Sequence, residues 1–182
     1  MPLGIGVKAD AFTSFIGMMY STPVRLHFNF YKSPYIHESR NQIVEEAKKA
    51  KTTHLMFIDT DLTYHPDGII RLLNHNKEMV AGGYKMKTSD SKGTVKILKD
   101  GQYVNVDNPP KVLFQCDVAP CGFMLIDMRV FDKIKFPYFS PDYDSQDIVT
   151  EDVYFCRKVK EAGIDIWCDG SLELGHIGEY IY

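Results

Sequence analysis

The chain has 182 residues, 45% of them apolar and 25% charged, which is the composition of a globular domain large enough to bury its own core. Its 21 basic and 24 acidic residues give a net charge of -3 without any basic run, so we expect no nucleic-acid partner. No apolar run is long enough to cross a bilayer, and the N-terminus lacks the pattern of a signal peptide. We therefore expect no transmembrane segment and a cytoplasmic protein, in the host-cell cytoplasm if a virus or phage encodes it.

Strand and helix patterns alternate through the first half. The predicted strands are short and apolar or aromatic, and they cover 3–7, 24–31, 54–58 and 79–84. One predicted helix starts at Ser33-Pro34, with serine as its cap, and runs to about Lys51. A second starts at Pro66 and continues through Leu73.

The second half starts with a hairpin and returns to the same alternation. Thr94–Val106 reads as two β-rich arms joined by the turn Asp100-Gly101. The elements expected after it are a strand at 118–126, a helix at 127–134, a loop at 136–146, a helix from Thr150 to Gly163 and a strand at 164–168. This order predicts a single α/β domain, a mainly parallel sheet flanked by helices with a small β-hairpin insertion.

The cysteines do not indicate a zinc site. Cys116, Cys121, Cys156 and Cys168 are scattered, and none belongs to a close C-x2-C pair. We expect four reduced thiols, with a Cys116–Cys121 disulfide as the alternative.

Two aspartates follow the apolar run at 54–58. Residues i and i+2 of an extended chain point the same way, and ligands of open α/β sheets bind at the carboxyl ends of strands. Asp59 and Asp61 can therefore converge on one divalent cation, which would relieve their mutual repulsion. A solvated turn at the end of the strand is the alternative.

A charged residue falls on the apolar row of the helix that precedes this strand. Arg40, followed by Asn41, shares its helical row with Ile36, Ile43 and Ala47. A guanidinium that faces inward needs a partner. An acidic cluster or a diphosphate would serve, and so would a structural ion pair with a buried aspartate.

Two further features stand late in the chain. Thr150-Glu151-Asp152 reads as a helix cap with two acids in the first turn, where they favour the helix dipole. Asp152 shares a row with Cys156, so it is also a candidate general base. His176 stands between glycines after the last predicted strand, and beside two aspartates it would complete an O,O,N set suited to Mn²⁺. A structural histidine is the alternative.

The ordered set of these segments resembles nucleotide-sugar glycosyltransferases of the GT-A fold, in particular the short glycosyltransferase-2-like group of phages, large viruses and bacteria. It is also distantly similar to the mannan-polymerase-type mannosyltransferases. The segments span about residues 37–178 and are ESRNQIVEEA, HLMFIDTDLTYHPDGIIRLL, VAGGYKMK, APCGFMLIDMRVF, TEDVYFCRKVKEAGIDIWCD and LGHIG.

The resemblance implies a nucleotide-sugar-binding half, about 1–90, and an acceptor-binding half, about 91–182. The donor would be a UDP- or GDP-sugar, held through Mn²⁺ (or Mg²⁺), and the acceptor a hydroxyl of a glycan or protein. The metal ligands would be Asp59, Asp61 and His176, and Asp152 would take the proton of the acceptor hydroxyl. The remaining donor-binding residues would be Lys8, Asp10, Arg40, Asn41 and Gly122. Here GVKADAF stands where the family has a Pro-Thr-like segment, so Lys8 and Asp10 depart from the pattern.

Two other functions remain open at this point. Asp59-Thr60-Asp61-Leu62-Thr63 fits the D-x-D-x-T motif of haloacid-dehalogenase-like phosphatases, in which the first aspartate attacks phosphorus. A non-catalytic sugar-binding protein is the third reading. The aromatic loop at 136–146 is expected either to close over a ligand or to be a plain surface loop.

Overall fold

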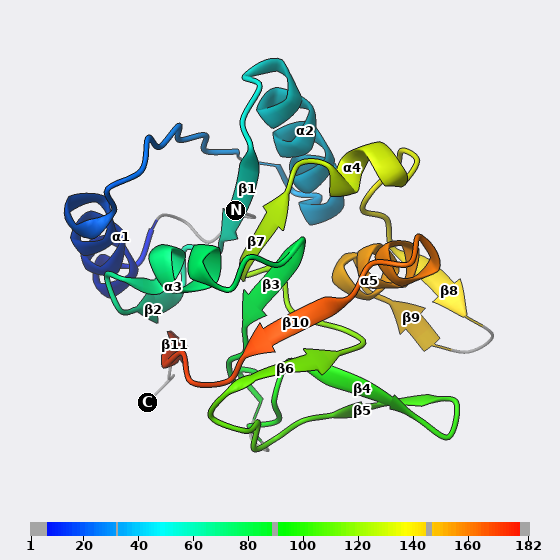
Figure 1. The fold of residues 1–182 in the computed structure, drawn as a ribbon. Helices are drawn as coiled ribbons and strands as arrows, with labels where there is room; N and C mark the ends of the chain where they lie inside the picture. Colours follow the sequence, from blue (N-terminus) through cyan, green and yellow to red (C-terminus); the bar gives the residue numbers. More distant parts are fainter. Residues whose placement is uncertain (1–6, 32, 89–90, 145–146, 179–182) are drawn as a thin grey trace.

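The computed structural model describes residues 7–31, 33–88, 91–144 and 147–178, and it has a mixed α/β fold built on a central sheet (Figure 1). Five strands form this sheet, in the spatial order β1 (His54–Ile58), β7 (Phe123–Asp127), β3 (Met79–Gly82), β10 (Ile166–Asp169) and β6 (Leu113–Cys116). The strand predicted at 3–7 lies almost wholly outside the described residues.

The prediction of a mainly parallel sheet is wrong for the described strands. Only β3 and β10 pair in parallel, whereas β7 is antiparallel to both β1 and β3, and β6 is antiparallel to β10. The alternation of helix and strand predicts the direction only of strands that follow a helical crossover. β6 and β7 both follow irregular chain, and each adds to the sheet in the opposite direction.

The strands reached through helices do run the same way. β1 and β3 are both antiparallel to β7, and β10 is parallel to β3, so the carboxyl ends of these three strands share one edge of the sheet. The register also places Phe123, the first residue of β7, opposite Ile58, the last residue of β1. Residues that follow β1 and β3 and those that precede β7 therefore meet at this edge.

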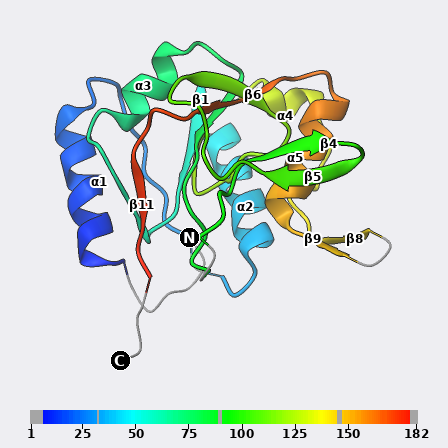
Figure 2. The same ribbon diagram turned by 90° about the horizontal axis from the view of Figure 1, so that it is seen from below.

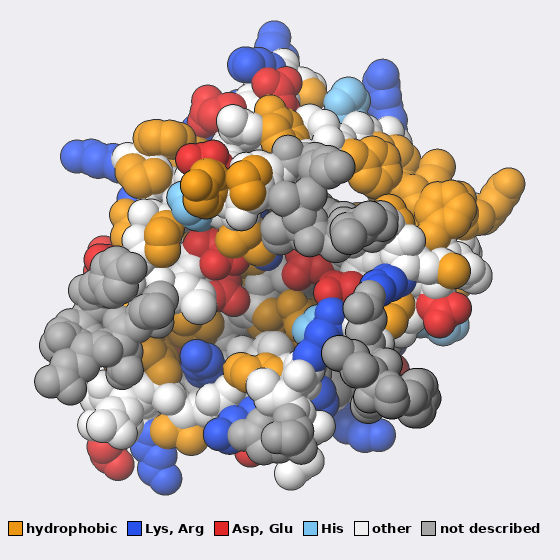
Figure 3. Space-filling view, turned by 180° about the vertical axis from the view of Figure 1, so that it is seen from behind, with side chains coloured by type: hydrophobic (Ala, Val, Ile, Leu, Met, Phe, Trp, Pro, Cys, Tyr) orange, Lys and Arg blue, Asp and Glu red, His pale blue; other side chains and the backbone are white. Residues whose placement is uncertain are grey.

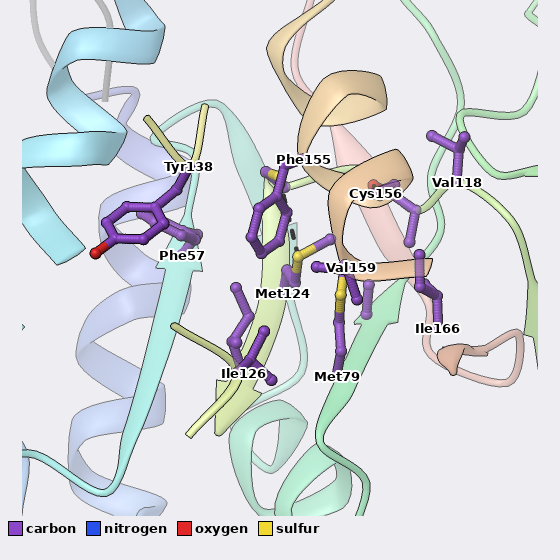
Figure 4. Packing of buried hydrophobic residues seen from close by; sticks show 14 of the residues in the cluster. Phe57, Met79, Val118, Met124, Ile126, Tyr138, Phe155, Cys156, Val159 and Ile166 are labelled. Atoms are coloured by element: carbon purple, nitrogen blue, oxygen red, sulfur yellow. Dashed lines mark hydrogen bonds between the residues drawn. The ribbon is translucent and has the colours of Figure 1, made fainter. Parts of the chain in front are cut away.

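Alternate side chains of the strands pack into two separate clusters, one on each face. On one face Met79, Met124 and Ile126 pack against α2 (Ile36–Lys49), α4 (Val130–Lys133) and α5 (Glu151–Glu161) (Figure 4). On the other face Val80 and Leu125 pack against α1 (Ala9–Ser21) and α3 (Gly68–Asn74). The sheet is thus covered on both sides, as a buried α/β sheet requires.

Three short strand pairs surround the sheet. β11 (Leu174–His176) pairs antiparallel with β2 (Leu62–Tyr64), and His176 lies opposite Leu62. β4 (Lys96–Lys99) and β5 (Gln102–Asn105) form the predicted hairpin, with Asp100 and Gly101 at positive φ in its turn. This hairpin lies at the end of the molecule away from α1 (Figure 2). β8 (Asp142–Asp144) and β9 (Asp147–Val149) form the third pair.

The N-terminal segment differs from its prediction. Residues 24–31 form no strand, and α1, which the sequence patterns did not predict, precedes them. The aromatic alternation of the segment serves packing instead: the rings of Phe28 and Phe30 stand edge-on to Phe15 of α1, with centroids 5.0 and 6.0 Å apart.

The cysteine prediction is confirmed. Cys116, Cys121, Cys156 and Cys168 are all free and buried, so the disulfide alternative is wrong. Burial raises the pKa of Cys156 to about 12, which keeps its thiol protonated and unreactive. Within the described part of the chain, no helix is long and apolar enough to cross a membrane.

Candidate functional site

Asp59 and Tyr84 meet over a glycine at the edge where β1 and β3 end and β7 begins. The amide of Asp59 donates to the carbonyl of Gly122 over 2.8 Å. A Cβ placed on Gly122 would overlap the Tyr84 hydroxyl and lie 2.7 Å from Oδ2 of Asp59. Glycine is therefore required here by close approach, and Gly122 shapes the floor of the site.

Arg40 reaches the same place from α2. Its side chain is 7% exposed, and its guanidinium lies 3.6 Å from Oδ1 of Asp59 and 3.6 Å from Oε1 of Glu151. The guanidinium also stands over the rings of Phe57 and Phe139, at 5.5 and 6.0 Å from their centroids. The inward orientation predicted for Arg40 is confirmed. Among the described residues its buried Nη1 has no hydrogen-bond partner, so this nitrogen remains available to a ligand.

Asp61 and His176 face each other across the β2–β11 pair. Nε2 of His176 is 3.7 Å from Oδ2 of Asp61, and the Ile177 amide donates to the Asp61 carbonyl over 2.8 Å. A Cβ on Gly175 would overlap the Thr63 side chain, so this glycine lets the two strands come close. Gly178 has open space around it, and close approach does not explain it.

The surroundings of His176 set its orientation. Its Nδ1 lies 2.8 Å from the carbonyl of Lys85, which can only accept, so Nδ1 carries the proton. Nε2 is then the ring nitrogen that faces Asp61, 3.7 Å from its Oδ2. The ring also stands edge-on to Tyr84, with centroids 5.0 Å apart. Together the two contacts fix the ring plane, and a backbone carbonyl bonded to the second ring nitrogen is usual for metal-binding histidines.

Three of the predicted acidic site residues shift the pKa of Tyr84. Burial raises the pKa of Tyr84 well above 10.0, and the negative charges of Asp59, Asp152 and Asp61 raise it further, against the opposing charge of Arg40. The phenol therefore stays neutral and available for hydrogen bonding.

The two acids at the start of α5 take different positions. Glu151 is turned towards Arg40, and burial raises its pKa above 4.5, helped by the charges of Asp152 and Asp59 and opposed by Arg40. Oδ1 of Asp152 accepts from the Thr150 hydroxyl and from the Val153 amide, the latter over 2.9 Å. Asp152 is thus held by the first turn of α5.

The side chain of Asn41, a predicted donor-binding residue, is bonded to the backbone of the loop after α4. Its Nδ2 donates to the Phe139 carbonyl over 2.7 Å, and its Oδ1 accepts from the amides of Tyr138 and Phe139 over 3.0 and 3.1 Å. These bonds occupy the amide group with loop backbone. Tyr138 and Phe139 are themselves buried, so this half of the predicted aromatic loop is anchored and is not a lid.

Lys8 and Asp10, the two N-terminal candidates, lie in different surroundings. The Lys8 amide donates to the Thr60 carbonyl over 3.3 Å, so Lys8 lies beside the turn between Asp59 and Asp61. Asp10 is exposed in the first turn of α1, and no contact among the described residues joins it to the cluster.

Three residues of the site were not predicted, and they are Tyr84, Glu151 and Lys87. Tyr84 follows β3 as Asp59 follows β1, so the carboxyl-end argument would have found it. Glu151 shares a helical row with the buried Phe155 and was as good a candidate as Asp152. Lys87, whose Nζ is 2.5 Å from Oδ2 of Asp61, lies on a loop and carried no signal.

A pocket of about 670 Å³ opens beside the cluster, between α1, residues 24–30, α2 and β1. Its wall is mostly apolar and includes the rings of Phe12, Phe15, Phe28, Phe30, Phe57 and Tyr64. Arg40, Asp59 and Thr60 of the cluster also line it. Thr60 Oγ1, like Nη1 of Arg40, is buried without a hydrogen-bond partner. Figure 3 shows a hollowed face with acidic and basic side chains and a histidine around the hollow.

The described residues fit a metal ion only in part. They contain no group of three or more His, Cys, Asp or Glu side chains arranged to hold one. They do contain a matched pair, because Oδ2 of Asp61 and the oriented Nε2 of His176 are 3.7 Å apart. Hard divalent ions in phosphate-transfer sites commonly complete their shell with one or two carboxylates and substrate oxygens. The residues present therefore offer two metal ligands, a carboxylate and an imidazole, and leave the rest of a coordination shell to other groups.

Comparison with known proteins informs the fold. No family model matches the sequence, and no curated protein matches it. Among solved structures, the crystal structure of A197 from STIV is similar, with a TM-score of 0.69 and 18% sequence identity over 98% of this chain and 83% of that chain. At this identity the likeness concerns the fold alone.

Proposed function

We propose that the protein is a metal-dependent glycosyltransferase of GT-A type that moves a sugar from a UDP- or GDP-sugar to a hydroxyl of a glycan or protein. The observation that carries the proposal is the pairing of Asp61 with His176. The last short strand returns a histidine to the Asp-x-Asp turn, with Nδ1 bound to the Lys85 carbonyl and Nε2 free to face Asp61.

The pocket and its buried donors support a nucleotide-sugar donor. Aromatic walls suit a flat base or a sugar face. A guanidinium with an unpaired Nη1 at the inner end suits a diphosphate, since Arg binds such oxygens in a planar fork. Asp59, Asp61 and His176 would hold Mn²⁺ or Mg²⁺. The ion would supply positive charge that offsets the negative charge developing on the departing diphosphate.

Other side chains of the site would have the remaining roles in the reaction. Asp152 is our candidate for the base that takes the proton of the acceptor hydroxyl, because it stands in the first turn of α5 within electrostatic reach of Tyr84. Glu151 positions Arg40 through their 3.6 Å pair. Tyr84, neutral and packed on Gly122, contacts the His176 ring edge-on and would help to hold that ring in place.

Calorimetry with nucleoside diphosphates tests the proposal. Wild-type protein should bind UDP or GDP with Mn²⁺ present and much more weakly with chelator. Asp61→Ala should lose at least about tenfold in affinity, since a charged ligand contact is worth about 1.5–3 kcal/mol. The matched control is Asp67→Ala, because the Asp67 carboxylate is exposed and bonded to His65 at the start of α3. Equal affinities for wild type and Asp61→Ala would remove the metal role.

The same protein preparations distinguish the two alternatives. Turnover of a generic phosphomonoester that disappears in Asp59→Asn would identify a phosphatase with Asp59 as its nucleophile. Donor binding with neither sugar transfer nor donor hydrolysis would identify a sugar-binding protein. Metal-dependent release of the nucleoside diphosphate from its sugar is the result that the proposal expects.

A further inference from the structure

A lysine ammonium occupies the place beside Asp61 where a cation is needed. Nζ of Lys87 lies 2.5 Å from Oδ2 of Asp61, and the same oxygen is 3.7 Å from Nε2 of His176. The two side chains of the ion pair are 36% and 33% exposed. The lysine therefore neutralises the carboxylate that the proposed function assigns to the metal.

The backbone that carries Lys87 is tied to the site. Lys85 bridges Gly93, and the Met86 amide donates to the Lys92 carbonyl over 2.8 Å, so these residues form the base of a small turn. The Lys85 carbonyl also accepts from His176. The backbone two residues before Lys87 is thus fixed by the proposed metal ligand, and the long lysine side chain can change partner while its attachment stays in place.

We propose that Lys87 is an exchangeable internal cation, which holds the Asp61 position in the free protein, yields it to the divalent ion, and then binds the donor diphosphate. This inference rests on the proposed function and deepens it. It assigns Lys87 two successive partners within one site, first a carboxylate of the protein and then phosphate oxygens of the substrate.

Electrostatics supports the exchange. An ammonium and a divalent cation on the same carboxylate oxygen repel each other, so metal binding displaces the lysine. An ion pair whose side chains are about one-third exposed is only weakly stabilising, so the exchange has a low cost. The displaced ammonium then lies next to the incoming diphosphate, whose oxygens attract it more strongly through charge-assisted hydrogen bonds.

The test compares Lys87→Met with Lys99→Met. Lys99 is exposed at the end of β4, on the hairpin, so its loss changes the net charge equally without touching the Lys87–Asp61 ion pair. Calorimetry measures Mn²⁺ alone and then UDP or GDP in saturating Mn²⁺. Lys87→Met should bind Mn²⁺ alone about two- to fivefold more tightly, because the competing ion pair is gone. It should bind the diphosphate about tenfold more weakly, because a charged phosphate contact is lost. Lys99→Met should match wild type in both.

The opposite signs of the two changes are the diagnostic result. Lys87→Arg, which keeps the charge, should restore diphosphate affinity. Unchanged affinities in Lys87→Met, or a gain in both, would overturn the inference while leaving the proposed function intact. If neither wild type nor Lys87→Met binds Mn²⁺ or a diphosphate, the proposed function itself fails.

Discussion

Glu151 and Asp152 are sequence neighbours at the start of α5 with different surroundings. Glu151 pairs with the buried Arg40, whereas Asp152 is held by the Thr150 hydroxyl and the Val153 amide. The difference separates a positioning acid from a candidate base. Two substitutions distinguish the roles.

Asp152→Asn should retain donor affinity and lose transfer. The amide keeps the shape of the side chain but cannot take a proton, and loss of a general base lowers turnover by about 10²–10⁴-fold. Single-turnover transfer and calorimetry on the same preparation measure both quantities. Asp165→Asn, an exposed acid beyond the same helix, is the control. Near-normal turnover in Asp152→Asn would reduce Asp152 to a residue that stabilises the helix.

Glu151 should leave a signature in the pH dependence of stability. Burial raises its pKa above 4.5, so the folded protein holds this proton more tightly than the unfolded chain. The resulting stabilisation is complete below the unfolded pKa and is lost as the pH rises through the folded pKa. Glu151→Gln cannot titrate. Urea unfolding should therefore show wild type losing stability relative to Glu151→Gln as the pH rises from about 4.5. Parallel profiles would contradict the assignment.

At the scale of elements, Asn41 links α2 to the chain that follows α4. It makes three hydrogen bonds with the backbone of Tyr138 and Phe139. Asn41→Ala should lower the free energy of unfolding by about 2–4 kcal/mol, because it leaves buried backbone groups unpaired. Nucleotide affinity of the folded fraction should change little. Asn74→Ala, at an exposed position at the end of α3, is the control for urea unfolding. A large loss of nucleotide affinity without loss of stability would restore the predicted donor-binding role.

The junction of β1, β3 and β7 depends on one glycine. Gly122→Ala should displace the Tyr84 hydroxyl and Asp59 Oδ2, both of which lie too close for a methyl group. We expect both stability and Mn²⁺-dependent nucleotide binding to fall, by about 1–3 kcal/mol in unfolding free energy. Gly178→Ala meets open space and should behave as wild type in the same assays. Normal nucleotide binding by Gly122→Ala would contradict the geometry of the site floor.

Local patterns predicted several elements well. The apolar run of β1, the Asp100-Gly101 hairpin and the end of α5 before Gly163 each have a short-range cause, and each is present. Residues 24–31 show how such a pattern misleads. Their alternating aromatics have the period of a strand, but the rings pack on Phe15 of α1, a helix that the preceding residues did not signal. A two-residue alternation shows which side chains share a face, but it does not show whether a partner strand exists.

At the scale of the whole molecule, sheet direction was the part that the sequence could not supply. Helical crossovers predicted that β1, β3 and β10 run the same way, and they do. The antiparallel insertion of β7 between β1 and β3 is a pairing of residues far apart in the chain. No local signal records it.

The site residues also divide into those with a local sequence signal and those placed only by tertiary contacts. Asp59 and Asp61 could be found because they follow a predicted strand, and Arg40 because it interrupts an apolar helical row. The approach of His176 to Asp61 depends on β11 pairing with β2, which the sequence supported only through the family resemblance. Lys87 lies on a turn whose position is set by tertiary contacts, so no pattern predicted it.

The central claim is that the turn at Asp59–Asp61 and the returning His176 hold a metal ion together with a donor diphosphate. Anomalous diffraction from crystals grown with Mn²⁺ and UDP or GDP tests it most directly. We predict one manganese peak within bonding distance of both the Asp61 carboxylate and Nε2 of His176, bridged to the diphosphate, with Arg40 on the phosphate oxygens. A diphosphate bound elsewhere, or bound here with His176 still away from the ion and no manganese at Asp61, would contradict the account.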